Sequence, residues 1–496
     1  MTNVRWMDTR HGCVQAGPVT VAADRAPTRA REVERVPRQA WIVFAAGSIA
    51  MAQSGLALSI LNVAFPSLRD DFTGSSPSTL SWVINLYTIV AGALLVVSGV
   101  IVDRLGPKRV VIAGGLLFSV ASLSCGLAPN VALLLVARVV QASGSALLTP
   151  SCTALIVGAF PDSHRATAVA GYAATGSIAS GFGPTLGGLL VDAGGWRWAF
   201  YAMVPGGVLG ALLVALVVRE SRAPVRRPMP DLLGASLIMV SVGLVIGGLV
   251  QSRAWGWDDP RVGGGILAGV AIGGLIVHRS RHHRTPVLDL TLFRSRSFTM
   301  ANIGTFAFSV GFFGVFFGYP LFLRDVWHFS PRDAGLLMTP IAACGVVVAP
   351  LAGRVIRTRG PGVLLLPAGL SVVAGSLLLL LAAGPARDVT AVWLPAIFLT
   401  GIGASAVWPC LYAGVVLDIQ SDRYAAASGI NQTIQRSGTA FGAALAVTLL
   451  GPTTGIDGIG SFDRIFAMAL VCGVLTVVMA RFFTGHRTAG TPGVGG

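Results

Sequence analysis

Two stretches of this sequence read alike although 254 residues separate them. The first is Gly99-Val-Ile-Val-Asp103-Arg104-Leu105-Gly106-Pro107, and the second is Gly353-Arg-Val-Ile-Arg357-Thr358-Arg359-Gly360-Pro361. Each follows a long apolar run and closes with Gly-Pro, a pair that marks a turn. The matching position and register of the two stretches indicate a duplicated unit of helices.

The apolar runs around both stretches are long enough to cross a membrane. The chain has 496 residues, of which 53% are hydrophobic and only 11% charged, and its mean hydropathy is +0.73. A soluble domain carries about 25% charged residues, and one span needs about 20 apolar residues. Charge-free runs predict fourteen transmembrane helices, at 40–65, 79–102, 110–127, 131–157, 166–191, 198–218, 232–250, 262–277, 299–323, 334–353, 362–383, 391–416, 425–450 and 465–483.

The duplication divides these helices into six, two and six. We therefore predict an all-α membrane protein with six-helix bundles at 40–218 and 299–484, and an inserted helix pair at 232–277. Residues 1–38 lack the compact apolar core of a cleavable signal. We interpret them as a disordered cytoplasmic tail, and residues 485–496 as a second cytoplasmic tail.

The charges of the loops predict the orientation. The loops after the even-numbered helices hold 17 Lys and Arg, whereas the loops after the odd-numbered helices hold 8. Basic loops stay in the cytoplasm, so both termini are predicted to be cytoplasmic. This rule also accounts for the net charge of +15, which in a soluble protein would suggest nucleic acid. We expect anionic membrane lipids and no nucleic acid as partners.

The sequence gives no sign of catalytic chemistry. The cysteines have neither a disulfide framework nor metal-ligand spacing, and the histidines fall in predicted loops or tails. His278, His282 and His283 stand in a basic stretch that topology and anionic lipid explain better than a metal. No GxxxxGK[ST] stretch for binding nucleotide is present. We expect no enzyme activity, no metal and no cofactor.

The first turn of the duplicated pair is a candidate gating loop. Its residues are Gly99, Asp103, Arg104, Gly106, Lys108 and Arg109. A small residue at Gly99 would let a neighbouring helix approach, and Asp103 would accept a charge-assisted hydrogen bond from the facing bundle. A basic loop that only sets the topology explains the same residues equally well.

This turn resembles the signature loop between helices 2 and 3 of the major facilitator superfamily. Three further features resemble that superfamily or its fourteen-helix drug:proton antiporter branch. They are Arg138, Gln141, Gly144 and Ala146, with Ala142 in place of the usual glycine; Gly183-Pro184 with Gly187-Gly188; and Asn62-Val-Ala-Phe-Pro66 with Trp196-Arg197-Trp198. The resemblance covers about residues 40 to 484.

The resemblance implies a secondary active transporter in the bacterial cell membrane. It would export small molecules such as drugs, antibiotics or metabolites by alternating access, through proton-coupled antiport, and would confer drug resistance. It implies a small-molecule substrate and protons as partners, and we expect a monomer. The alternative is uptake or facilitated transport of a small solute.

Three sets of residues within the spans are candidates for the transport machinery. Gly183, Pro184, Gly187 and Gly188 would form a hinge, because proline removes a backbone donor and glycine allows close packing. Arg138, with Gln141 one turn away, and Arg436 are candidates for a central charge, although each arginine could instead be structural or, for Arg436, reach the membrane edge. Asn62, Asn85, Tyr87, Trp408 and Asn431 could line the substrate pathway or join helices.

One departure from the family pattern concerns acids. All 21 Asp and Glu lie in the tails, in loops or at the borders of loops, and none is in the centre of a predicted span. Ala57 stands where the antiporter branch usually has an aspartate. Arginines without a carboxylate would disfavour cations and suit neutral or anionic compounds. Proton coupling would then use acids at the membrane edge, such as Asp70, Asp71, Asp103 or Asp418, or an acid of the substrate.

Overall fold

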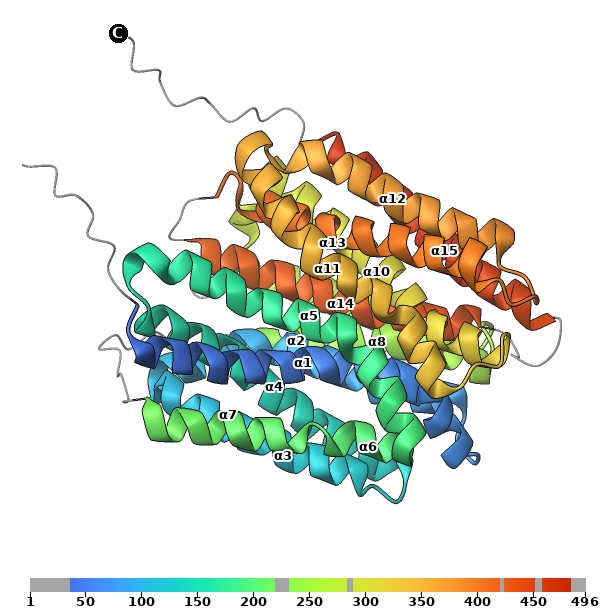
Figure 1. Ribbon diagram of the computed structural model, residues 1–496, viewed down its shortest axis with the longest axis horizontal. Helices are drawn as coiled ribbons and strands as arrows, with labels where there is room; N and C mark the ends of the chain where they lie inside the picture. The colour runs from blue at the N-terminus through green and yellow to red at the C-terminus, as the bar shows by residue number, and fades with distance from the viewer. Residues whose placement is uncertain (1–35, 219–231, 283–288, 420–422, 451–456, 483–496) are drawn as a thin grey trace, which may run out of the picture. The chain divides into compact units, whose positions relative to one another are not determined.

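The computed structural model describes residues 36–218, 232–282, 289–419, 423–450 and 457–482. Figure 1 shows these residues as a set of long helices that run roughly alongside one another. The predicted tail at 485–496 and nearly all of the predicted tail at 1–38 lie outside the described residues.

The described residues form helices joined by turns and contain no strand, which confirms the all-α class. The first helices are α1 (Arg38–Asp71), α2 (Pro77–Leu105), α3 (Pro107–Gly126), α4 (Val131–Ala159), α5 (Asp162–Gly194), α6 (Trp196–Tyr201) and α7 (Val204–Val217). They are followed by α8 (Leu232–Trp255), α9 (Pro260–His282), η1 (Leu290–Arg294), α10 (Arg296–Asp325), α11 (Pro331–Arg359), α12 (Pro361–Ala382), η2 (Val389–Trp393), α13 (Leu394–Val416), α14 (Tyr424–Leu449) and α15 (Asp457–Ala480).

Eleven of the helices in the described ranges are long and apolar enough to cross a membrane. The count of fourteen, and the division at 40–218, 232–277 and 299–484, stay predictions. One predicted span, 198–218, is broken into α6 and α7, because Pro205 stands at the start of α7 and cannot continue a helix. His278 and His282 were predicted in a loop, but they belong to the last turns of α9. Positive charge at the C-terminal end of a helix interacts favourably with the helix dipole.

The duplicated stretches have the same backbone geometry. Gly106 and Gly360 have φ of 88° and 83°, a left-handed conformation that favours glycine. Each donates its backbone N–H to the carbonyl four residues back and precedes a helix that begins with proline. The equivalence extends upstream, since Ser76 and Ser330 both cap the next helix through the side chain. The 254-residue offset is therefore also an offset in structure over residues 71–107 and 325–361.

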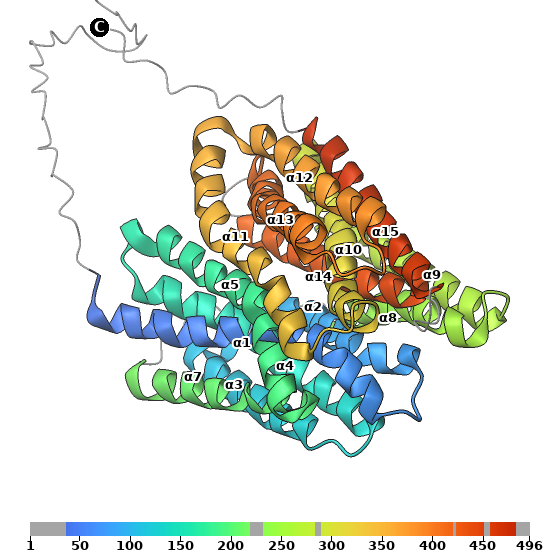
Figure 2. The ribbon, with the colours of Figure 1, turned by 45° about the vertical axis from the view of Figure 1, so that its right-hand side comes forward.

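The helices pack mainly with neighbours from the same part of the chain. The pairs α1 with α5, α3 with α4, and α2 with α4 are extensive in the first part, as are α10 with α14 and α12 with α13 in the second. The two parts meet along α5 with α11, α2 with α14, and α1 with α10. Figures 1 and 2 both show α5 beside α11. These three helix pairs position the candidate site.

The pair formed by α8 and α9 packs against this junction from one side. The two helices contact each other, and α8 also packs on α2 and α14 (Figure 2). Ile246 and Val250 of α8 are buried in a small cluster with Ile89 of α2 and Ala440 of α14. The insert thus contributes side chains to the wall between the two parts.

Candidate functional site

Arg138 on α4 is buried and held by several partners. Its side chain is only 1% exposed. Nε donates to the backbone carbonyl of Val83 on α2 at 2.7 Å, and Nη1 donates to Oε1 of Gln141 at 2.6 Å. Gln141 in turn donates from Nε2 to the Ser122 hydroxyl on α3 at 2.7 Å. The predicted pair of Arg138 and Gln141 is therefore a network that ties together α2, α3 and α4.

Tyr87 on α2 contacts Arg138, and Arg436 on α14 packs against α2 further along that helix. The guanidinium of Arg138 lies over the Tyr87 ring, 4.3 Å from its centroid, a cation–π arrangement. A Cβ at Gly92 on α2 would lie 3.1 Å from Cβ of Arg436, so Arg436 packs directly on α2. Arg436 stands midway along α14 and not at its end. The structure thus brings the predicted pathway residue Tyr87 to Arg138, and it places Arg436 where α14 packs on α2.

Several buried polar atoms of α2 and α14 have no hydrogen-bond partner among the described residues. They are Nη1 of Arg436, the Tyr87 hydroxyl, and both polar atoms of the Asn85 side chain, all buried. A buried donor without a partner costs free energy, and native proteins contain few of them. In the described ranges the acids lie in loops or within about two turns of helix ends, so no carboxylate faces the two arginines.

The remaining predicted pathway residues have different surroundings. Asn431 on α14 donates from Nδ2 to Asn302 Oδ1 and to the Thr305 hydroxyl, both at 3.0 Å, so it joins α14 to α10. Trp408 packs edge-on against Phe308, with ring centroids 4.9 Å apart. Asn62 is buried on α1. Asn431 and Trp408 thus have their partners in the second part of the chain.

The predicted gating loop is partly described. Lys108 donates from Nζ to the carbonyl of Ala215 at 2.9 Å, which satisfies a backbone group at the end of α7. Arg104 and Arg109 are exposed, and the side chain of Asp103 lies outside the described residues. A Cβ at Gly99 would meet no atom of the described chain within 4 Å, so the expected close approach of a neighbouring helix is not seen there.

The predicted hinge residues of α5 pack against two helices. A Cβ at Gly187 would lie 3.0 Å from the Ile60 carbonyl of α1, and one at Gly188 would lie 3.2 Å from the Gly335 Cα of α11. The reverse also holds, because a Cβ at Gly335 would lie 3.2 Å from the Cα of Gly188. Thr185 and Thr339 share a hydrogen bond of 2.7 Å across this contact. We call the contact of Thr185 and Gly188 with Gly335 and Thr339 the α5–α11 seam.

Charged residues join the ends of α1 and α10 on the same side as the seam. Nη1 and Nη2 of Arg69 donate to the two carboxylate oxygens of Asp325, each at 3.2 Å. Arg324 lies 3.9 Å from Asp70. We call Arg69, Asp70, Arg324 and Asp325 the end quartet. Sequence reasoning named only Asp70 of these four, although Asp71 and Asp325 stand 254 residues apart and the repeat could have pointed to the facing end.

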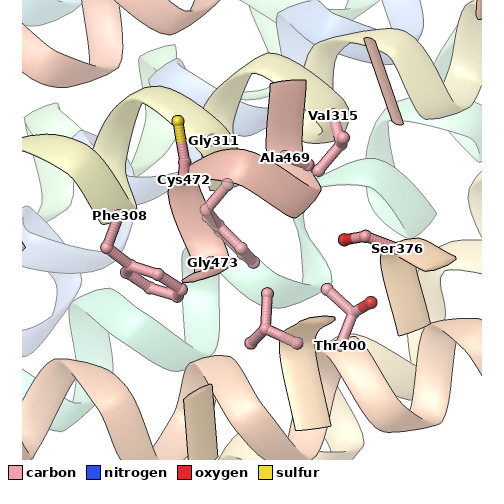
Figure 3. Close-up of a pocket in the computed structure, with 10 residues that line it drawn as sticks. Phe308, Gly311, Val315, Ser376, Thr400, Ala469, Cys472 and Gly473 are labelled. Atoms are coloured by element: carbon pink, nitrogen blue, oxygen red, sulfur yellow. The ribbon is translucent and has the colours of Figure 1, made fainter. Parts of the chain in front are cut away.

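A separate hollow lies inside the second part of the chain. Figure 3 shows that Phe308, Thr400 and Cys472, among others, surround it. Its lining comes from α10, α12, α13 and α15 and is mostly apolar and small. It has room for about one water molecule, so we interpret it as a packing defect and not as part of a pathway.

Comparison with known proteins gives the family. Residues 47–443 match the model of the Major Facilitator Superfamily. The chain belongs to this superfamily. It is 32% identical over 395 residues to Multidrug resistance protein Stp of Mycobacterium tuberculosis, covering 79% of this chain and 72% of that protein. It is 28% identical over 419 residues to the Tetracenomycin C resistance and export protein of Streptomyces glaucescens, covering 84% and 77%.

The fold agrees with this membership. A crystal structure of the peptide transporter POT in complex with sulfate superposes with a TM-score of 0.65 at 17% identity, covering 90% of this chain and 96% of that one. The superfamily and the apolar helices make this protein a multi-pass membrane transporter and not an enzyme.

Proposed function

We propose that this transporter exports small molecules from a bacterial cell by alternating access, in exchange for protons. Two relatives are named for drug resistance, and one of these also for export. The proposal places the protein in the cell membrane with both termini in the cytoplasm, as the loop charges predict.

The observation that carries the proposal is the α5–α11 seam. Alternating access needs one end of the pathway sealed while the other end is free to receive substrate. The seam and the end quartet join the two parts on the side that the loop charges assign to the outside. On the other side, a Cβ at Gly99 or at Gly353 would meet no described atom within 4 Å. This pattern supports a state in which the pathway is closed toward the outside and substrate enters from the cytoplasm.

Proton exchange would use acids at the ends of the helices. Ala57 leaves α1 without a mid-membrane carboxylate, but Asp70 and Asp325 stand in the end quartet. In this scheme the link between Arg69 and Asp325 couples proton movement to the outer seal.

Transport into inverted membrane vesicles tests the proposal. With neutral, anionic and cationic drugs as a panel, we expect at least one compound to accumulate, and only when the interior is made acidic. Full-rate transport without a pH gradient would eliminate antiport.

The alternative is uptake or facilitated transport, which the lack of a mid-membrane acid favours. Cells that express the protein would then accumulate a compound of the panel instead of resisting it. Vesicles with an inactive variant, Gly335→Leu, separate carrier activity from leakage in both assays.

A further inference from the structure

The helix α9 is the least buried of the candidate membrane spans in the described chain. It packs extensively on α8, and η1 also contacts it. Figure 2 shows the pair of α8 and α9 at the edge of the helices. The buried residues of α9 are Val262, Gly269, Ile276 and Ser280, whose spacing places them on one face of the helix. The opposite face is left uncovered by the described chain.

The uncovered face carries a row of residues that changes from apolar to basic. The row consists of Leu267, Val270, Gly274, His278 and Arg281, all exposed, and we call it the α9 stripe. The spacing of three or four residues places them along one side of the helix. From Leu267 to His278 the stripe is about 17 Å long at a rise of 1.5 Å per residue, close to the depth of one leaflet, about 15 Å. The apolar part of the stripe therefore matches the length of an acyl chain.

Several basic side chains gather at the end of the stripe. The rings of His278 and His282 lie with their centroids 4.9 Å apart, and Nδ1 of His282 donates to the carbonyl of His278 at 3.0 Å. Arg281 and His282 are both exposed. The next element, η1, packs on α9 and ends at the exposed Arg294. An anion at this end of α9 would meet several donors, two of them guanidinium groups.

The stretch that carries these cations offers them no free carboxylate. Asp289 is the one acid between residues 260 and 324 of the sequence. Its carboxylate already accepts hydrogen bonds from Thr291 and Arg423. The positive charge at the end of the stripe is therefore available to an external anion.

The two ends of α9 indicate that lipid and not protein covers the stripe. Trp255 and Trp257, between α8 and α9, are 43% and 61% exposed, and tryptophan is typical of the membrane–water interface. A second copy of the chain in the same orientation would bring its own Arg281 to the same level, where like charges repel. A lipid with an anionic headgroup complements both the apolar and the basic part of the stripe.

We propose that Arg281, His278 and His282 bind the phosphate of an anionic phospholipid, whose acyl chain lies along the apolar part of the α9 stripe. Arg294 of η1 adds attraction for the same headgroup. The inserted helix pair thereby acquires a lipid-binding role of its own. This inference goes beyond the proposed function and does not rest on it.

Lipid-induced stabilisation of the purified full chain in a non-ionic detergent tests the inference. The probes are dioleoyl phosphatidylglycerol, which is anionic, dioleoyl phosphatidylcholine, which has the same acyl chains without net charge, and glycerol 3-phosphate, which has no chains. A ligand that binds the folded protein raises its thermal midpoint according to ln(1 + [L]/Kd). We expect phosphatidylglycerol to bind at least about tenfold more tightly than phosphatidylcholine, because each basic residue near the surface contributes about fivefold.

Glycerol 3-phosphate distinguishes a lipid site from a site for free phosphate esters. At the concentration at which phosphatidylglycerol saturates, it should leave the thermal midpoint unchanged, since it cannot contact the apolar part of the stripe. A shift equal to that of phosphatidylglycerol would overturn the assignment to lipid.

Substitutions at the basic end decide whether the α9 stripe is responsible. Arg281→Gln should lower the affinity for phosphatidylglycerol about fivefold and leave that for phosphatidylcholine within about twofold. Arg281→Gln combined with Arg294→Gln should leave the two lipids within about twofold of each other. Arg359→Gln removes the same charge from the exposed end of α11 and should preserve the preference. Equal binding of the two lipids, a preference that survives the double substitution, or an equal loss in Arg359→Gln would overturn the inference.

Discussion

The two copies of the repeated segment are alike at their ends and different in their middle. Ser76 and Ser330 cap the equivalent helices α2 and α11, and Gly106 and Gly360 form equivalent turns after them. Midway along, α2 carries Asn85 and Tyr87, whose polar atoms have no partners.

The positions 254 residues later on α11 are Thr339 and Ile341. Thr339 is bonded to Thr185 within the α5–α11 seam. The difference teaches that the two copies share their turns and caps, whereas the equivalent positions within the helices have different surroundings, without polar partners in α2 and in contact with α5 in α11.

We expect the largest difference in transport between substitutions of two glycines of α11, Gly335 and Gly353. Gly335→Leu would force α5 and α11 apart, because a Cβ at that position already lies 3.2 Å from the Gly188 Cα. We expect transport of every substrate to be lost in vesicles, as overpacked sites do not accommodate added volume. Gly353→Leu is the matched control, since a Cβ there meets no described atom within 4 Å. Equal activity of the two variants would refute the assignment of the seam.

The next effect concerns Arg138 on α4, which is hydrogen-bonded to Val83 within the first copy. Arg138→Ala leaves Gln141 without its partner and creates a cavity among α2, α3 and α4. We expect a loss of stability of about 2–5 kcal/mol together with loss of transport. Arg138→Lys should recover only part of this, because one ammonium does not reproduce the planar fork that reaches Val83 and Gln141. The measurement is the thermal midpoint in detergent, and a midpoint unchanged in Arg138→Ala would contradict the network.

A smaller effect tests whether the ends of the copies are equivalent. Ser76→Ala and Ser330→Ala each remove an oxygen that accepts a hydrogen bond from the backbone N–H three residues later. Loss of such a cap costs about 1 kcal/mol. We expect the two variants to lose similar stability in urea titrations and to transport normally. A strong loss of transport in only one of them would break the comparison between the copies.

The smallest effect is a pH dependence that lies outside both copies. Asp289, before η1, accepts hydrogen bonds from Thr291 and Arg423. Partial burial raises the pKa of Asp289, but these hydrogen bonds outweigh it and hold the pKa below its ordinary value.

The pair with Arg423 therefore stabilises the fold above the ordinary aspartate pKa of about 3.9, and the contribution is lost as pH falls through the lower, folded-state pKa. Asp289→Asn should leave the shape of the transport profile between about pH 6 and 8 unchanged. A transport profile altered between these pH values would show that Asp289 takes part in the coupling of transport to protons.

The sequence allowed much of this molecule to be predicted, for physical reasons that differ between regions. Long charge-free runs favour spans, and Gly-Pro at 106–107 and 360–361 follows basic residues at the end of such a run, so the class and the repeated turns were accessible. Arg138 and Arg436 were found because a charge within a span demands an explanation. The end quartet was missed, since Arg69 and Asp325 look like ordinary loop charges until the folded chain brings them within 3.2 Å. Which polar atoms lack partners, as in Asn85 and Tyr87, depends on packing that no local pattern encodes.

The most direct test asks whether the α5–α11 seam must open during transport. Thr185→Cys and Thr339→Cys would be introduced together, because the hydroxyls of the two threonines lie 2.7 Å apart and a disulfide can span such a contact. Initial rates of transport into inverted vesicles would be measured after oxidation and after reduction, with each single variant as the control. The account predicts that oxidation stops transport only in the double variant and that reduction restores it. An unchanged rate while the disulfide is formed would contradict it.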